Sequence, residues 1–166
     1  ADGQAYWRKE YVIPDAVARD DRYKYDNSCD GDVWWYRGGG WFSITNESVK
    51  AELRSHDDNV LLICHGNANS IHEEWIEDMA KAAIDKYSAV LAVDWGEWSY
   101  GESGLMGENP EDTAFYIPIV ASRSVRQLRD GAGIKAEKLT LVGHSHGAHV
   151  AGHIAHDYGD PPRRLV

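Results

Sequence analysis

Three short runs of apolar residues recur along the chain from residue 60 onward, and a stretch with helical spacing follows each of them. The runs are Val60–Cys64, Ala89–Val93 and Leu139–Val142. Continuous apolar runs rich in branched residues are typical of strands buried on both faces of a parallel sheet. Strands that alternate with helices indicate βαβ units. The pattern therefore predicts an α/β fold, with helices on both faces of a parallel sheet.

The first helix is expected after Val60–Cys64. Ser70 fits the N-cap of a capping box that Glu73 completes, and apolar residues then recur every three or four positions through about Lys86. The third helix is predicted from His146 to Tyr158.

A second helix is predicted between the two later strands. Asn109-Pro110 opens it, because proline is favoured at the first helical position. We expect it to bend near Pro118 and to stop by Gly131, since proline interrupts a helix and glycine commonly ends one.

Residues 1–40 carry aromatic and charged side chains without a clean period, and we expect an irregular or β-hairpin extension there. Gly38-Gly39-Gly40 lies between the runs Val33–Tyr36 and Trp41–Thr45, which favours a hairpin. A glycine-rich phosphate loop is the alternative. No Lys-Ser/Thr pair follows the glycines and no helical pattern opens after them, which argues against it.

The composition narrows the class of protein. The chain has 166 residues, with 17 Lys+Arg against 27 Asp+Glu and a formal net charge of −10. This length suits one domain with a substantial core. The acidic balance argues against nucleic acid and anionic membranes as electrostatic partners. No apolar run approaches the roughly 18 residues that a membrane span needs.

The chain has two cysteines, Cys29 and Cys64, which do not make a disulfide framework. Cys64 ends an apolar run, so the simplest prediction is a buried thiol. A Cys29–Cys64 bridge in an oxidising compartment is the alternative.

The segments expected to carry chemistry are those that follow the three strands, because ligands of parallel sheets bind beyond the carboxyl ends of the strands. They are His65–Asn69, Asp94–Gly101 and Gly143–Gly147. The last reads Gly-His-Ser-His-Gly between a strand and a helix, which is the context of a nucleophile elbow. Glycines two residues before and after the serine allow a tight turn that larger side chains would block.

This turn predicts Ser145 as a nucleophile. The helix that follows directs amide N–H groups toward the place where an oxyanion would form, and the N–H of His146 is one donor. The N–H of Asn67, after His65-Gly66, is the natural second donor. An idle serine in a phosphate- or nucleotide-binding turn is the alternative, and it predicts further glycines or a lysine near the helix start, which are absent.

From about Trp41 to Val166 the chain resembles the pancreatic-type lipases of the α/β-hydrolase fold. The resemblance rests on the stretch Leu139–Gly152, on Val93-Asp94-Trp95 and on Ile63-Cys64-His65-Gly66. It implies a serine carboxylic-ester hydrolase of lipase or phospholipase type, with Ser145 as nucleophile and the N–H groups of Asn67 and His146 as oxyanion hole. It also implies secretion, with which a chain that begins at Ala1 agrees.

Two positions depart from the usual family pattern. His146 and Asn67 stand where the family usually has apolar or aromatic residues, which implies a more polar acyl site. A preference for long acyl chains therefore does not follow from the resemblance.

The general base and the acid that orients it are missing from the pattern. In this family they follow the serine in the order Ser, Asp, His, and the acid is expected about two dozen residues after Ser145, past the next strand. Residues 163–166 look like the beginning of that strand. We therefore expect residues 1–166 to be the N-terminal part of one α/β-hydrolase domain, with Asp and His supplied by a second chain or a downstream fragment. His65 is the least unsuitable internal base, and His144 is expected to pack beneath the turn.

Four histidines of the third helix are spaced three, four and three residues apart: His146, His149, His153 and His156. A metal-binding stripe is one interpretation, but such sites usually need a carboxylate or a second element, and we favour a part-buried helix face. No cofactor is predicted. An ester or lipid substrate is expected, and a lipase-like lipid-binding or carrier protein without turnover is the competing function.

Overall fold

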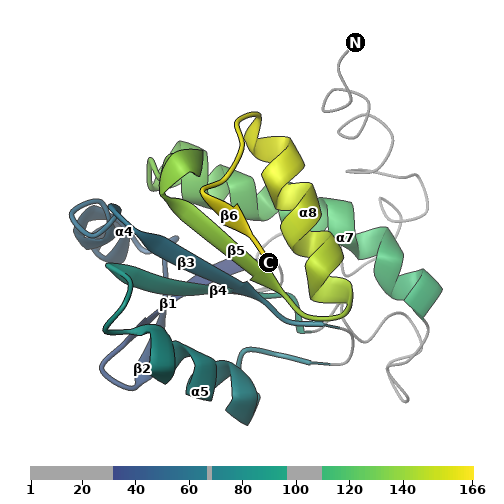
Figure 1. Cartoon of the computed structure of the whole chain (residues 1–166), viewed down its shortest axis with the longest axis horizontal. Helices are drawn as coiled ribbons and strands as arrows, with labels where there is room; N and C mark the ends of the chain where they lie inside the picture. Colours follow the sequence, from purple (N-terminus) through teal and green to yellow (C-terminus); the bar gives the residue numbers. More distant parts are fainter. Residues whose placement is uncertain (1–31, 67–68, 97–109) are drawn as a thin grey trace.

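Six strands form one sheet in the part of the chain that the structure, a computed structural model, describes: residues 32–66, 69–96 and 110–166 (Figure 1). The order across the sheet is β2-β1-β4-β3-β5-β6. The sheet is mixed and mostly parallel, with helices on both faces, so the α/β prediction is confirmed.

The three strands predicted from the apolar runs lie side by side at the centre of the sheet. They are β3 (Val60–Cys64), β4 (Ala89–Asp94) and β5 (Leu139–Gly143). β3 is parallel to both of its neighbours, and all five of its residues are buried. The carboxyl ends of the three strands therefore meet at one edge of the sheet, as a parallel arrangement requires.

The hairpin predicted around the glycines is also present. β1 (Asp32–Arg37) and β2 (Gly40–Ser43) pair antiparallel across Gly38 and Gly39. Both glycines have positive φ, 57° and 82°, which the tight turn of a two-residue hairpin demands. The phosphate-loop alternative is wrong, because these glycines close a hairpin. β1 continues the sheet by pairing antiparallel with β4, and nothing in the sequence pattern indicated that partner.

At the opposite edge, β6 (Arg164–Leu165) runs parallel to β5. The prediction that residues 163–166 begin a further strand is confirmed. Leu165 and Val166 are exposed there.

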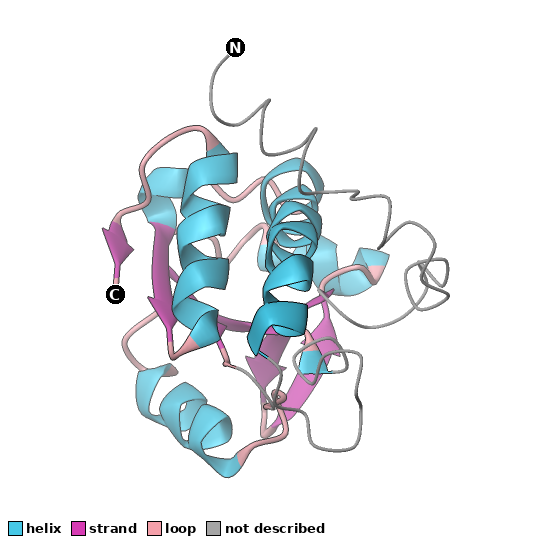
Figure 2. Ribbon diagram, turned by 90° about the vertical axis from the view of Figure 1, so that its right-hand side faces the viewer, coloured by secondary structure: helices cyan, strands magenta, loops and turns pink. Residues whose placement is uncertain are grey.

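Two apolar clusters cover the two faces of the sheet. On one face lie α7 (Pro110–Val125) and α8 (His146–Tyr158), which pack against each other (Figures 1 and 2). On the other face lies α5 (Glu74–Ala83), whose Ile76 and Ala80 meet strand residues such as Ile63. Alternation of side chains along each strand divides the core in this way.

The helix after β3 differs from the prediction at both of its ends. α5 begins at Glu74, because Ser70 closes a separate turn: its Oγ accepts from the His72 N–H at 3.2 Å. A capping pattern fits such a turn as well as a helix start. α5 ends at Ala83 rather than near Lys86.

The sequence pattern did not distinguish three other helical elements, which are a π-helix, a short α-helix and a 3-10 turn. After α7, which contains Pro118, a π-helix continues over Arg126–Gly131, so the predicted end by Gly131 is confirmed. A short helix, α4 (Glu47–Leu53), was not predicted, and a 3-10 turn, η2 (Ala136–Lys138), precedes β5. None of the described helices is long and apolar enough to cross a membrane.

Candidate active site

The turn between β5 and α8 holds Ser145 in an unusual backbone conformation. Its φ is 57° and its ψ is −126°, and no other described non-glycine residue has a positive φ. A conformation of this kind costs on the order of 1–3 kcal/mol and persists only where the surrounding structure enforces it. We call residues 143–147 the serine turn. Its central side chain is exposed.

Two glycines allow the serine turn to close. A β-carbon on Gly143 would meet the backbone N of Ala148 at 2.6 Å, and one on Gly147 would meet the carbonyl oxygen of His65 at 2.5 Å. Real β-carbons essentially never come so close to backbone atoms. The glycine pattern seen in the sequence is therefore a steric requirement, as predicted.

A third glycine brings the loop after β3 against the serine turn. A β-carbon on Gly66 would meet the carbonyl oxygen of His144 at 2.7 Å and Ser145 Cβ at 3.0 Å. The His144 N–H also donates to the Cys64 carbonyl at 3.2 Å. The structure thus brings the ends of β3 and β5 together at Ser145. Asn67, the second predicted oxyanion donor, lies outside the described residues.

His146, the other predicted oxyanion donor, is the first residue of α8. The N–H groups of Gly147 and Ala148 donate to the carbonyls of His144 and Ser145. No hydrogen bond from the His146 N–H occurs among the described residues, as expected for the first residue of a helix. Its imidazole is half-buried. That burial, with a smaller contribution from His149, lowers the pKa of His146 below its usual value.

His65 is fully buried and has a structural role. Its Nε2 accepts from the Trp95 backbone N–H at 3.2 Å, which assigns the ring proton to Nδ1, and Nδ1 lies 3.0 Å from the Gly66 carbonyl oxygen. Trp95 stacks on the imidazole and donates from Nε1 to the His65 carbonyl at 2.9 Å. Asp94 Oδ1 lies farther from Nε2, at 3.5 Å. Both ring nitrogens make hydrogen-bond contacts with groups other than Ser145, so the hypothesis that His65 acts as an internal base is wrong.

His144 does not pack beneath the turn. Its side chain is exposed, and its ring lies edge-on to Trp75 with centroids 5.4 Å apart. Trp75 is in turn held by a hydrogen bond from its Nε1 to Asn69 Oδ1 at 3.2 Å. The sequence indicated Trp75 only as an apolar helix position, and its contact beside the serine turn depends on the tertiary structure.

All eight histidines of the chain lie in the described part, and none of them makes a hydrogen bond with the Ser145 side chain. A serine hydroxyl needs such a base to become an effective nucleophile. The described residues therefore bring together the serine, the loop after β3 and a helix N-terminus, but not a base.

The four histidines of α8 do not form a metal centre by themselves. No group of three or more potential ligands converges among residues 32–66, 69–96 and 110–166. The rings of His146 and His149 lie 6.2 Å apart. Burial lowers the pKa of His153 to about 4, with smaller contributions from His149 and His156. A part-buried helix face agrees with these observations.

Cys64 is a free and fully buried thiol at the end of β3. Burial raises its pKa to about 12, so it remains protonated at neutral pH. This environment does not activate a thiol as a nucleophile.

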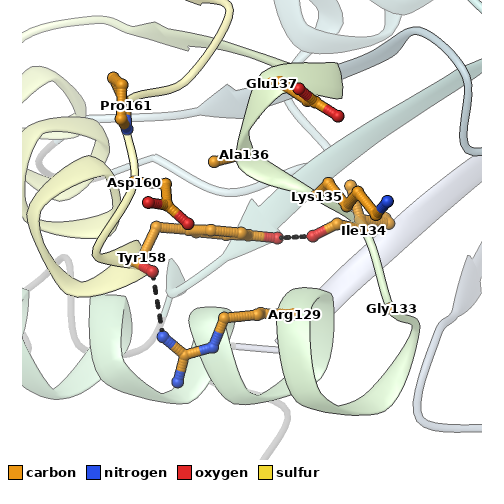
Figure 3. Close-up of a pocket in the computed structure, with 9 residues that line it drawn as sticks. All are labelled: Arg129, Gly133, Ile134, Lys135, Ala136, Glu137, Tyr158, Asp160 and Pro161. Carbon is orange, nitrogen blue, oxygen red and sulfur yellow. Dashed lines mark hydrogen bonds between the residues drawn. The ribbon is translucent and has the colours of Figure 1, made fainter.

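A separate hollow of about 610 Å³ lies at the far end of α8 (Figure 3). Its walls are held by hydrogen bonds: Tyr158 Oη donates to the Ile134 carbonyl at 2.6 Å, and Arg129 donates to the Tyr158 carbonyl at 3.2 Å. Thirteen residues of helix, about 20 Å, separate it from Ser145. It has no serine, cysteine or histidine in its lining, so it lacks the hydroxyl or thiol nucleophile and the imidazole base of a serine or cysteine hydrolase. The lining residues are Arg129, Gly133, Ile134, Lys135, Ala136, Glu137, Tyr158, Asp160 and Pro161.

Comparison with known families agrees with the geometry. The family model described as Lipase matches residues 41–165, which is most of the chain. The chain belongs to the lipase family. Members of this family are, in general, hydrolases of carboxylic esters. No curated protein matches the chain. The matched segment begins at β2 and includes the serine turn, so β1 and the residues before it lie outside the match.

Proposed function

We propose that the chain carries the nucleophile of a serine carboxylic-ester hydrolase of lipase or phospholipase type, which works through an acyl-enzyme. The observation that carries the proposal is the backbone of Ser145. An exposed serine is held in a costly conformation between a buried strand and a helix, in a member of the lipase family. Strain of this kind is found at active sites because a functional geometry requires it.

In the proposed reaction, Ser145 Oγ attacks the ester carbonyl carbon and passes its proton to a histidine, which returns a proton to the departing alcohol. The negative charge on the carbonyl oxygen is held by the N–H groups of Asn67 and His146, and the N-terminus of α8 adds a favourable dipole. Water then attacks the acyl-enzyme and releases the acid. The position of His146 as first residue of α8 supports its part in this scheme.

We further propose that the histidine and its orienting aspartate come from outside residues 1–166, on a downstream segment or a second polypeptide. Two observations support this. None of the eight histidines, all of which lie among the described residues, makes a hydrogen bond with the hydroxyl of Ser145. The outermost strand, β6, leaves Leu165 and Val166 exposed, and a further strand beside it would extend the sheet.

A fluorophosphonate probe tests the nucleophile directly, because it reacts only with an activated serine. We expect labelling of the native assembly to stop in Ser145→Ala and to persist in Ser55→Ala, whose exposed hydroxyl donates to the Glu52 carbonyl and lies 3.1 Å from His56 Nδ1. Labelling elsewhere in the chain, or labelling that survives Ser145→Ala, would refute the assignment.

An ester-hydrolysis assay tests the origin of the base. The isolated 166 residues should show little turnover, and addition of the complementary polypeptide should restore it. Full activity of the 166 residues alone would overturn the proposed external base. Mass spectrometry of the native sample would identify the complementary chain.

A lipid-binding protein without turnover is the second candidate. Among the described residues no histidine makes a hydrogen bond with the Ser145 hydroxyl, and this favours the second candidate, because a serine without a base does not turn over. This function predicts binding of lipid with no fluorophosphonate labelling in the native assembly. We also propose secretion, which is typical of this family.

A further inference from the structure

The N-cap and first turn of α4 contain a motif that the proposed reaction does not use. Asn46-Glu47-Ser48 is the one Asn-x-Ser/Thr triplet in the 166 residues, and its middle residue is not proline. This triplet is the acceptor for N-linked glycans in secreted proteins. We propose that Asn46 Nδ2 carries an N-linked oligosaccharide. The proposal rests on secretion of the chain and is independent of its catalytic activity.

Of the two polar atoms of the Asn46 side chain, Oδ1 accepts hydrogen bonds from the described part of the chain and Nδ2 does not take part in any there. Oδ1 accepts from the Ser48 N–H at 3.0 Å, from the Val49 N–H at 3.3 Å and from Ser48 Oγ at 2.7 Å. These bonds make Asn46 the N-cap of α4. Nδ2 makes no hydrogen bond within the described part of the chain. The nitrogen that a glycan would modify is therefore available, while the oxygen keeps its structural role.

Exposure agrees with this assignment. Residues 45–48 are four consecutive exposed positions, so a bulky group on Asn46 points into solvent. α4 is anchored from its other side, where Leu53 is fully buried and Val49 packs against the core. A glycan at the N-cap would therefore leave the packing of α4 unchanged.

The position of α4 also leaves the serine turn accessible. α4 lies at the end of the molecule where β3 begins, whereas α8 starts at the opposite end of β5 (Figure 1). A glycan on α4 would project from a region well away from Ser145. Modification of Asn46 and approach of an ester to the serine are thus sterically compatible.

The chemistry is a group transfer with no change of oxidation state. The co-reactant is a lipid-linked oligosaccharide pyrophosphate. Asn46 Nδ2 forms a bond to the anomeric carbon of the first sugar of the oligosaccharide, and the bond from that carbon to the pyrophosphate oxygen breaks. Nδ2 loses one proton, which balances the negative charge that the departing pyrophosphate gains. The lipid pyrophosphate is the leaving group. The transfer requires a serine or threonine at the third position of the triplet. Ser48 occupies that position, and its hydroxyl donates to the Asn46 amide oxygen.

The test is secretion of the full chain from a eukaryotic host, followed by peptide mapping with and without a glycan-releasing amidase. We expect the peptide that contains residue 46 to carry a glycan and to contain aspartate at position 46 after amidase treatment. Asn46→Asp should be unglycosylated and should match the amidase-treated wild type, which also has aspartate at position 46. Both should fold, because aspartate caps a helix as well as asparagine does.

Two variants at the third position complete the test. Ser48→Ala should lose the glycan although Asn46 is intact, and Ser48→Thr should keep it. An unmodified Asn46 in the secreted protein would overturn the proposal. A glycan that remains on Asn46 in Ser48→Ala would also overturn the proposal, because the triplet would then not direct the transfer. Neither result bears on fluorophosphonate labelling of Ser145, so the two proposals fail separately.

Discussion

A β-carbon on Gly147 would overlap the carbonyl oxygen of Cys64, the last residue of β3. α8 therefore starts in direct contact with the end of the neighbouring strand, with no space for a side chain between them. The contact fixes where the helix begins and hence where Ser145 lies relative to the loop after β3. Position 147 is thus determined by a strand that is more than eighty residues away in sequence.

The first prediction concerns this contact. Gly147→Ala should lower the free energy of unfolding by about 3 kcal/mol or more, because backbone atoms cannot yield as a flexible side chain would. It should also abolish fluorophosphonate labelling of Ser145. Urea unfolding and labelling of the same preparations measure both effects.

Gly152→Ala is the matched control on the same helix. A β-carbon at Gly152 meets nothing within 4 Å, and alanine favours a helix interior by roughly 0.5–1 kcal/mol over glycine. This variant should be as stable as the wild type or more so, with labelling unchanged. Equal losses at positions 147 and 152 would contradict the steric explanation.

The second prediction concerns the strain at Ser145. Glycine adopts a positive φ without the steric penalty that a β-carbon brings. Ser145→Gly should therefore be more stable to urea than Ser145→Ala, by about 1 kcal/mol. Both variants lack the hydroxyl, so the comparison isolates the backbone. If alanine were the more stable of the two, the positive-φ conformation of residue 145 would not be strained.

The third prediction concerns the buried indole of Trp95. Trp95→Phe removes the indole donor to the buried His65 carbonyl, and loss of a buried hydrogen bond costs about 1–3 kcal/mol beyond the loss of ring volume. Trp34→Phe is the control, because Trp34 Nε1 is buried with no hydrogen-bond partner in the described part of the chain. Thermal or urea unfolding should show the larger loss for Trp95→Phe. Equal losses would mean that the hydrogen bond contributes nothing to stability.

The fourth prediction is a pH dependence that arises on α8. The pKa of His153 is lowered to about 4 in the folded chain, against 6.5 for an unperturbed histidine. Between these values the unfolded chain binds more protons at this residue than the folded chain does. The contribution of His153 therefore makes the protein less stable as the pH falls from about 6.5 to about 4.

Urea unfolding at neutral and mildly acidic pH measures this dependence. His153→Gln, which cannot be protonated, should lose less stability over that interval than the wild type. His72→Gln, on the exposed turn before α5, should behave as the wild type does. An unchanged slope in His153→Gln would show that burial does not oppose protonation of this residue.

The sequence by itself determined the central strands and the serine turn. Apolar runs such as Val60–Cys64 are long and branched enough that only a doubly buried strand suits them, and the glycines around Ser145 predicted a tight turn that the structure contains. The strands and Gly143 were predictable because they depend on neighbours within a few residues, where pattern and geometry are closely linked. Gly147 was predicted from the motif, but the contact that requires it, with the end of β3, is known only from the structure.

The tertiary structure alone decided which distant residues meet. The pairing of β1 with β4 and the enclosure of His65 by Trp95 depend on contacts across the sheet that leave no periodic signal. The same is true of His144, which lies exposed beside Trp75 rather than beneath the turn. A local pattern states what a residue can do, but the burial and the partners of its side chain are set by chain segments far away in sequence.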